Sequence, residues 1–336
     1  MIQSLLVEVS DESGVGEARR SCARLSRLVA LDEEAAGRVA LVATEIATNL
    51  VRHATRGQRF VARTLAGAGV EVLGIDAGPG IADLSAVLRD GYSTTGTSGT
   101  GLGAVRRLAD DFEIYSQVGS GTVVLARVLS PGAARRPVAL DLGCIMTAMS
   151  GESLPGDGYS ILETADRTSI LVADGLGHGP DAAAAAAAAV RAFHEGPGRS
   201  PGEHVHAIHA ALGQTRGAAI GVADVLVHER RLVYAGVGNI AGTVVSAHQT
   251  RSFVSHDGIA GHMLHRVQEF TYEFPADALL VMHSDGLTSR WNLLGYPGIL
   301  LRDPAIIAAV LYRDAERGRD DTTVLVARAR PAASRT

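Results

Sequence analysis

The pattern of apolar and polar positions divides the chain into two halves of mixed secondary structure. In the first half, apolar residues at helical spacing predict helices over 14–30 and 33–54, and a third helix is expected after Gly101. Short runs rich in Val, Leu and Ile predict strands over 4–9, 60–64, 70–75 and 123–128.

Short strands dominate the second half, with three helices among them. The helix that begins at Pro180 contains eight consecutive Ala residues, so we expect it to be buried and packed closely on a sheet. Mixed strands and helices predict an α+β fold for both halves. The predicted strands are 140–149, 158–164, 168–173, 218–227, 231–237, 242–246, 278–283 and 322–328, and the predicted helices are 180–194, 202–214 and 303–315.

A domain boundary is predicted where Pro, Gly and Arg interrupt the apolar periodicity between the two halves. We therefore expect a domain over 1–128, a linker over 129–137, a second domain over 138–330 and a disordered tail over 331–336. A length of 336 residues agrees with about two domains.

Composition narrows the possible functions. A net charge of −5 gives no electrostatic reason to expect binding to nucleic acid or to an anionic membrane. No apolar run has transmembrane length and no signal-peptide pattern opens the chain, so we expect no membrane association and a cytoplasmic location. The two cysteines form no CxxC pair, which argues against a zinc ribbon, and a lone disulfide is not expected in a reducing compartment.

All 31 basic residues are Arg. A Walker A loop, a pyridoxal enzyme and a eukaryotic-type protein kinase each require a Lys, so these three classes are excluded. If the chain binds ATP, it must do so with another architecture.

Acidic residues next to predicted strands indicate a metal site in the second half. Asp174 begins the motif Asp-Gly-Leu-Gly-His-Gly, Asp285 lies in Ser-Asp-Gly-Leu, and Asp320 begins Asp-Asp-Thr-Thr. Asp157, within Pro-Gly-Asp-Gly, is a candidate fourth member. Carboxylates that crowd together repel unless cations neutralise them, and oxygen ligands favour Mg²⁺ or Mn²⁺.

Polar positions in the first half suggest a nucleotide site without a P-loop. Glu45 and Asn49 are four residues apart on one face of a predicted helix, where a solvated edge is the alternative interpretation. Asn49 could offer an oxygen to Mg²⁺, and Glu45 could orient or deprotonate a nucleophile. Asp76 follows a strand and could accept a hydrogen bond from an adenine amino group, while Gly78 and Gly80 would allow a flat ligand to approach the backbone.

Two further Gly-rich segments complete this set. The Gly-, Ser- and Thr-rich stretch 91–103 ends at a predicted helix start, where backbone N–H groups can bind phosphate. Thr122 follows Gly119-Ser-Gly and precedes a strand, so its hydroxyl could contact the base.

In this order and spacing, residues 1–128 resemble the GHKL ATPase/kinase superfamily (the Bergerat fold) and, within it, the RsbT-like anti-sigma and switch serine kinases. The resemblance implies a Bergerat-type α/β sandwich, ATP and Mg²⁺ as cofactors, and phosphoryl transfer to Ser or Thr of a STAS-domain partner. It implies that Glu45 acts as base and Asn49 holds Mg²⁺. Kinases of this class often pair, so a homodimer remains open. The residues implied to bind nucleotide are Asp76, Gly78, Gly80, Gly101, Leu102, Gly103 and Thr122.

Residues from about 137 to 330 resemble the SpoIIE-like branch of the PPM-type metal-dependent serine/threonine phosphatases, most closely its RsbX-like members. The resemblance implies a β-sandwich flanked by helices and two Mn²⁺ or Mg²⁺ ions that activate a water for attack on phosphorus. It implies that Asp157, catalytic Asp174 and the Gly175 carbonyl bind these ions, together with Asp285 and Asp320 rather than Asp321.

The roles of His178 and of three further histidines on one predicted helix are open to two interpretations each. His178 could be a general acid, but the alternative is that it shapes the turn before the Ala-rich helix. His204, His206 and His209 are near metal-ligand spacing, yet no Cys or carboxylate motif accompanies them, and we read them as a surface helix.

Together the resemblances predict a bifunctional regulator of bacterial stress or sigma-factor partner switching. Its first domain would phosphorylate a STAS-domain partner, and its second would remove phosphate from the same or a related partner. The alternative is that only the phosphatase is an enzyme and that the first domain senses nucleotide or docks a partner.

Overall fold

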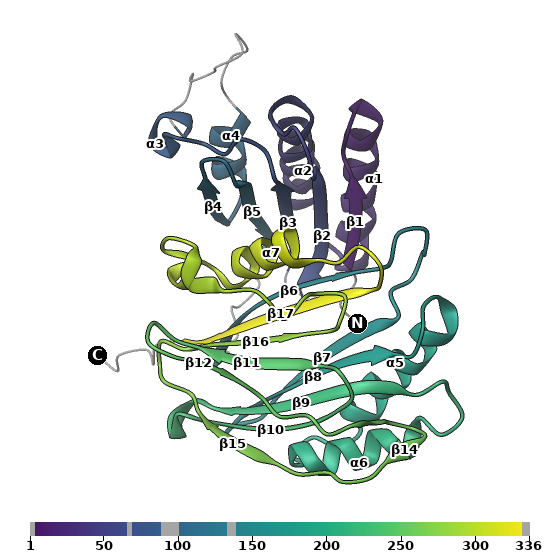
Figure 1. Ribbon diagram of the computed structural model, residues 1–336. Coiled ribbons are helices and arrows are strands. Elements are labelled where there is room, and N and C mark those ends of the chain that lie inside the picture. Colours follow the sequence, from purple (N-terminus) through teal and green to yellow (C-terminus); the bar gives the residue numbers. More distant parts are fainter. Residues whose placement is uncertain (1–3, 66–68, 89–100, 133–138, 331–336) are drawn as a thin grey trace. The chain divides into compact units, whose positions relative to one another are not determined.

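The computed structural model describes residues 4–65, 69–88, 101–132 and 139–330 (Figure 1). Contacts divide the chain into two compact units, Met1–Arg136 and Pro137–Thr336. The predicted tail, most of the Gly-rich stretch 91–103 and part of the predicted linker lie outside the described residues. No helix among the described residues has the length and apolar character needed to cross a bilayer.

The first unit is a two-layer α/β sandwich on one antiparallel sheet of order β1-β2-β3-β5-β4. Helices α1 and α2 cover one face of the sheet through residues such as Leu25, Val42 and Ile46, which pack against Val72 and Val124. The elements are β1 (Ser4–Glu8), α1 (Glu12–Leu28), α2 (Glu33–His53), β2 (Arg59–Leu65), β3 (Gly69–Asp76), α3 (Leu84–Val87), α4 (Gly101–Leu108), β4 (Asp111–Gln117) and β5 (Gly121–Leu129).

Two differences from the predicted elements of this unit have local causes. Helix α1 begins two residues earlier than predicted because Asp11 caps it, with Oδ1 accepting hydrogen bonds from Ser13 N at 2.9 Å and Gly14 N at 3.1 Å. Strand β4 was not predicted. It is an edge strand in which only Ile114 and Tyr115 are buried, so its apolar pattern is weak.

The second unit is a β-sandwich of two five-stranded sheets with helices on both outer faces (Figure 1). The two sheets have the orders β15-β10-β9-β8-β7 and β12-β11-β16-β17-β6. The strands are β6 (Leu140–Thr147), β7 (Asp157–Glu163), β8 (Thr168–Gly175), β9 (Ala218–Leu226), β10 (Arg231–Val237), β11 (Ala241–Val245), β12 (Thr250–Ser252), β13 (Gly258–Ile259), β14 (Met263–Leu264), β15 (Phe270–Glu273), β16 (Leu279–His283) and β17 (Thr322–Ala329).

Three helices cover these sheets. Helices α5 (Pro180–His194) and α6 (Pro201–Ala211) pack on the β8–β9 side, and α7 (Pro304–Ala315) packs on β6 and β17. The Ala-rich helix α5 is buried against the sheet, as predicted: a Cβ placed on Gly175 would lie only 2.2 Å from the Ala182 carbonyl oxygen. Small residues therefore let the start of α5 approach the end of β8, where Asp174 lies.

The surface-helix interpretation of His204 is wrong. Its side chain is fully buried in α6, where its ring packs 4.4 Å from the Phe193 ring (centroid to centroid). Neither ring nitrogen has a hydrogen-bond partner in the part of the chain that the structure describes. His206 is exposed, and His209 accepts a hydrogen bond from Gly261 N at 3.0 Å. These three histidines do not converge on one site.

Candidate active sites

The acidic residues of the second unit come from both sheets of the sandwich. Asp157 and Asp174 are directly opposite each other on the neighbouring strands β7 and β8 of one sheet. Asp285 follows β16, and Asp320 and Asp321 precede β17, which is its neighbour in the other sheet. The sandwich thus brings together carboxylates that are up to 164 residues apart, from Asp157 to Asp321.

Hydrogen bonds connect the two sheets at this point. Ser284 Oγ donates to Asp157 Oδ2 at 2.6 Å, and Thr323 N donates to Ser284 Oγ at 2.9 Å. All three residues are buried. These contacts hold the start of β7 against the end of β16 and the start of β17.

Other hydrogen bonds fix single carboxylates. Asp321 Oδ1 accepts from Met149 N at 2.8 Å, and Asn239 Nδ2 donates to Asp285 Oδ2 at 2.7 Å. Asp320 Oδ1 accepts from Asp321 N at 2.9 Å. Each of these three carboxylates is therefore oriented by a hydrogen bond to one of its oxygens, and its other oxygen is left for a further ligand.

The electrostatic environment disfavours ionisation of these carboxyl groups. Burial raises the pKa of Asp174, and the carboxylates of Asp157, Asp285, Asp320 and Asp321 raise it further. Burial also raises the pKa of Asp157 against the opposing effect of Ser284, and the charges of Asp321 and Asp320 add to the increase. The pKa values of Asp285 and Asp321 are raised by burial and by Asp320. Divalent cations would remove this repulsion.

Two unpaired oxygens fit a cation site. Asp157 Oδ1 and Asp321 Oδ2 are buried and have no hydrogen-bond partner among the described residues, which is costly for a carboxylate unless a cation is bound nearby. Across the described ranges, however, no three His, Cys, Asp or Glu side chains are arranged closely enough to form a ready-made metal site. The carboxylates converge, but their side chains do not already form a closed shell.

Several polar residues of this site were not among the predicted site residues. Ser284 and Thr323 lie within the motifs that identified Asp285 and Asp320, but their contact with Asp157 depends on how the two sheets meet. Asp321 is 2 % exposed, whereas Asp320 is only partly buried. The predicted ligand Gly175 ends β8 beside Asp174, and its N–H donates to Gly156 O at 3.1 Å.

His178 lies at the exposed end of the Asp-Gly-Leu-Gly-His-Gly loop. Its Nδ1 pairs with Glu152 Oε1 at 2.7 Å, and its side chain is 57 % exposed. Glu152 comes from the loop between β6 and β7, the same loop that supplies Met149 N to Asp321. The pair connects two loops of the site, which supports a role in shaping the turn.

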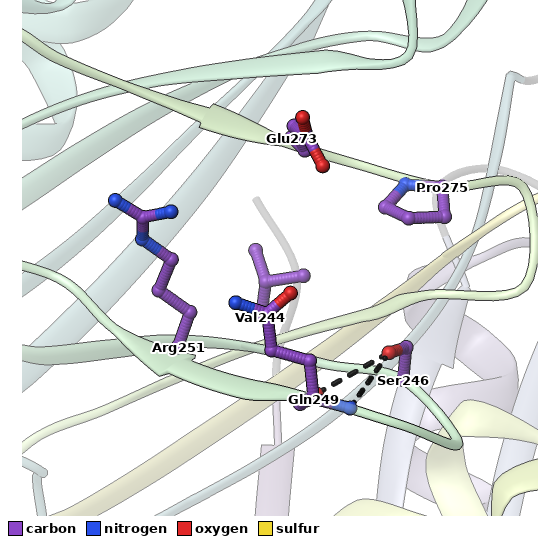
Figure 2. A pocket seen from close by; sticks show the side chains of 6 residues that line it. All are labelled: Val244, Ser246, Gln249, Arg251, Glu273 and Pro275. Atoms are coloured by element: carbon purple, nitrogen blue, oxygen red, sulfur yellow. Dashed lines mark hydrogen bonds between the residues drawn. The ribbon is translucent and has the colours of Figure 1, made fainter.

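A separate hollow in the second unit does not compete with this site. Val244, Ser246, Gln249, Arg251, Glu273 and Pro275 line it (Figure 2), and its volume is about 30 Å³. Its lining contains one carboxylate, Glu273, and no cluster of acidic side chains, so it is not a candidate for the metal site.

In the first unit, α2 brings Glu45 and Asn49 to the start of α4. A Cβ placed on Gly101 would lie 3.3 Å from both Asn49 Oδ1 and Glu45 Oε2. Asn49 Nδ2 is buried and has no hydrogen-bond partner among the residues that the structure describes, which stop at Leu88 and resume at Gly101. Gly101, Leu102 and Gly103 form the first turn of α4, whose N–H groups have no partner within the helix itself.

The predicted adenine site lies at the ends of β3, β4 and β5. Asp76 and Thr122 are opposite each other on neighbouring strands, and Asp76 Oδ1 accepts from Gly78 N at 2.7 Å. Ser116 Oγ lies 2.9 Å from Thr122 Oγ1 and accepts from Ile81 N at 2.8 Å. Ser116 was not predicted because strand β4 itself was missed.

Close backbone contacts explain two glycines of this site. Gly121 has φ of +99°, and a Cβ there would lie 2.0 Å from Asp76 O. Gly80 has φ of +72°, and a Cβ there would lie 2.2 Å from Gln117 O. Glycine is therefore required at both positions for the turns to approach the strand ends.

Comparisons with known proteins identify a family for each half of the chain. Residues 9–128 match the histidine kinase-like ATPase domain family, and residues 164–330 match the stage II sporulation protein E (SpoIIE) family. A 91-residue stretch is 36% identical to the serine/threonine-protein kinase RsbT of Bacillus subtilis (strain 168), covering 26% of this chain and 68% of RsbT.

Two solved structures are also similar to this chain. A structure described as part of the bacterial stressosome, a modular system adapted to control secondary messenger signalling, is 26% identical with a TM-score of 0.53. The match covers 56% of this chain and 99% of that one. The PP2C phosphatase domain of SpoIIE from Bacillus subtilis, solved with a fragment of its regulatory domain, has a TM-score of 0.50 at 16% identity. That match covers 95% of this chain and 93% of that one, and it supports the fold alone.

Proposed function

We propose that this chain, which belongs to the RsbT-like histidine kinase-like ATPases in its first unit and to the SpoIIE PP2C-type phosphatases in its second, is a bifunctional regulator of partner switching. Its first unit transfers phosphate from ATP to Ser or Thr of a STAS-domain protein. Its second unit hydrolyses phosphoserine or phosphothreonine on the same or a related protein.

The observation that carries the phosphatase assignment is the convergence of five aspartates from two sheets. These residues are Asp157, Asp174, Asp285, Asp320 and Asp321. Two of their buried oxygens, Asp157 Oδ1 and Asp321 Oδ2, have no hydrogen-bond partner among the described residues. An all-oxygen donor set suits Mg²⁺ or Mn²⁺ and gives no reason to expect zinc. We assign Asp157, Asp174, the Gly175 carbonyl, Asp285 and Asp320 as the residues that would hold two such ions.

The metal ions and the protein side chains would contribute different parts of the hydrolysis. When bound, the ions would supply an activated water and neutralise charge on the phosphoryl oxygens. Asp174 lies where the negative charges of the other four aspartates all raise its pKa, so a cation bound beside it would relieve the most repulsion. Asn239 restricts Asp285 to one orientation through its bond to Oδ2. The buried sandwich edge limits access of bulk water to Asp157.

The kinase assignment rests on the arrangement of Glu45, Asn49 and the start of α4. Asn49 would hold Mg²⁺, and Glu45 would accept the proton of the substrate hydroxyl. Asp76 and Thr122 would position adenine, and the first turn of α4 would bind phosphate. Because Glu45 and Asn49 both lie beside Gly101, the base and the phosphate site adjoin each other.

Hydrolysis tests the phosphatase assignment. Asp174→Asn is expected to reduce Mn²⁺-dependent release of phosphate from p-nitrophenyl phosphate to the rate of a blank, because the central carboxylate charge is lost. Asp166→Asn is the matched control, since Asp166 lies exposed in the turn between β7 and β8, where its Oδ1 accepts a hydrogen bond from Thr164 Oγ1 at 2.6 Å. A wild type without Mn²⁺-dependent hydrolysis would refute the assignment.

Transfer of labelled γ-phosphate from ATP to STAS-domain proteins tests the kinase assignment. Glu45→Ala is expected to abolish transfer, whereas the exposed Glu17→Ala on α1 should leave it unchanged. If the wild type labels no STAS-domain protein but still hydrolyses phosphoserine, the first unit is a nucleotide-sensing or docking module instead.

A further inference from the structure

A serine hydroxyl joins the two sheets at the centre of the proposed phosphatase site. Ser284 is fully buried, directly after β16. Its Oγ accepts a hydrogen bond from Thr323 N, at the start of β17, and contacts Asp157 Oδ2, at the start of β7. Strands β7 and β17 belong to different sheets.

The direction of this hydrogen-bond chain is fixed by its donors. A backbone N–H can only donate, so Ser284 Oγ is the acceptor for Thr323 N. The hydroxyl proton of Ser284 then points to Asp157 Oδ2, at 2.6 Å. Asp157 Oδ2 is therefore held as an acceptor. Oδ1, which has no hydrogen-bond partner within the described part of the chain, is the oxygen left for a cation.

A second contact holds the backbone of the same residue. Trp291 Nε1 donates to His283 Nε2 at 3.2 Å, and His283 Nδ1 lies 2.8 Å from the Ser284 carbonyl oxygen. Because an indole N–H only donates, Nε2 of this buried imidazole is the acceptor and Nδ1 carries the hydrogen given to Ser284 O. Ser284 is thus restrained at both its side chain and its carbonyl.

We propose that Ser284 is a positioning residue that orients Asp157 for divalent-cation binding by tying β7 of one sheet to β16 and β17 of the other. This inference rests on the proposed phosphatase function. Without the hydroxyl, Asp157 Oδ2 and Thr323 N would be buried and unpaired, and the Asp157 carboxylate would be free to rotate. Loss of a residue that orients a metal ligand typically lowers metal affinity by roughly 10–100-fold.

Calorimetric titration of metal-free protein with Mn²⁺ tests the proposal. Ser284→Ala and the near-isosteric Ser284→Cys are each expected to weaken Mn²⁺ binding by roughly 10–100-fold. Ser160→Ala is the matched control: Ser160 is also buried, lies on β7 itself and bonds His194 Nε2 at 2.8 Å. Thermal melting of each metal-free variant, followed by circular dichroism, identifies variants that are folded before titration.

The outcomes separate this proposal from the function on which it rests. If wild-type protein binds Mn²⁺ and a Ser284 variant binds it with an affinity within about twofold of that of Ser160→Ala, the proposed role of Ser284 is overturned. The phosphatase assignment would then still stand. If Ser284→Ala does not fold, Ser284→Cys alone decides by the same criterion, because it preserves side-chain volume. Wild-type protein that neither binds Mn²⁺ nor hydrolyses phosphoester would instead refute the proposed function.

Discussion

Glu71 and Asp157 are both buried carboxylates, but their surroundings differ. Burial alone would raise the pKa of Glu71, yet the charges and hydrogen bonds of Arg63 and Arg127 outweigh it and lower that pKa. The contacts are at 2.5 Å from Arg63 Nε and 2.7 Å from Arg127 Nε. Asp157 instead faces a serine and other carboxylates, and its pKa is raised. The first arrangement is suited to holding β2, β3 and β5 together, and the second to receiving a cation.

Replacing Glu71 tests the structural role of the first arrangement. Glu71→Gln removes the buried carboxylate that pairs with both Arg63 and Arg127, so we expect the free energy of unfolding of the first unit to fall by about 3–5 kcal/mol near neutral pH. Urea unfolding followed by circular dichroism measures the change. A loss below about 1 kcal/mol would show that the ion triad contributes little.

The same variant has a predicted pH dependence. The pKa of Glu71 is lower in the folded state than its ordinary value of 4.5, so the folded state favours the ionised form. The resulting stability is fully present above pH 4.5 and is lost as the pH falls through the lower, folded-state pKa. The difference in unfolding free energy between wild type and Glu71→Gln should therefore shrink below pH 4.5. A difference that is constant down to strongly acidic pH would contradict this explanation.

Single-residue chemistry was partly predictable from local motifs. Asp174 and Asp285 are each followed by Gly and come after an apolar run, and this local signal predicted that they lie at strand ends. Ser284 and Asp321 carry no such signal. Their contacts with Asp157 and Met149 depend on how two sheets meet across the sandwich, which no local pattern encodes.

At the scale of elements, the approach of α5 to β8 determines the position of Asp174. Gly175→Ala would place a Cβ 2.2 Å from Ala182 O, so the helix must shift away from the strand end. Overpacking of this kind costs about 1–3 kcal/mol. For a domain of this size, we expect the melting temperature to fall by roughly 2–12 °C, with a loss of phosphatase rate because Asp174 adjoins the strained position.

Gly295→Ala is the matched control for that experiment. Gly295 lies in a short 3₁₀ helix of the same unit, and a Cβ there meets no atom within 4 Å. We expect its melting temperature to remain close to that of the wild type. Equal melting temperatures and phosphatase rates for the two variants would show that α5 adjusts without cost.

Element prediction succeeded where burial gives a strong pattern. Helix α5 was predicted with its observed bounds, because its apolar run, Pro180 and Asp181 agree in marking a helix start. Helix α6 was predicted over 202–214 and is observed over Pro201–Ala211, since Ser200 caps it with Glu203 in a capping box. The short strands β12 to β15 were not predicted, because strands of two to four residues contain too few positions to show a period.

At the scale of the whole molecule, each unit has its own apolar core. Val42 and Ile46 belong to the core of the first unit, whereas Leu280 and Leu325 belong to that of the second. We expect the two chemistries to be separable in the full chain: Glu45→Ala should keep its phosphatase rate within about twofold of wild type, and Asp174→Asn should keep its transfer of phosphate from ATP. Paired assays on each purified variant measure both. A change of more than about fivefold in the distant activity would reveal coupling between the units.

Because one polypeptide carries both units, every copy of the proposed kinase is made with one copy of the proposed phosphatase. Gene dosage and translation cannot alter that ratio. The phosphorylation level of a shared substrate would then be independent of how much enzyme the cell contains. It would depend on the supply of ATP and divalent cations and on any ligand that favours the kinase reaction over the phosphatase reaction, or the reverse. Even a constant phosphorylation level would then consume ATP.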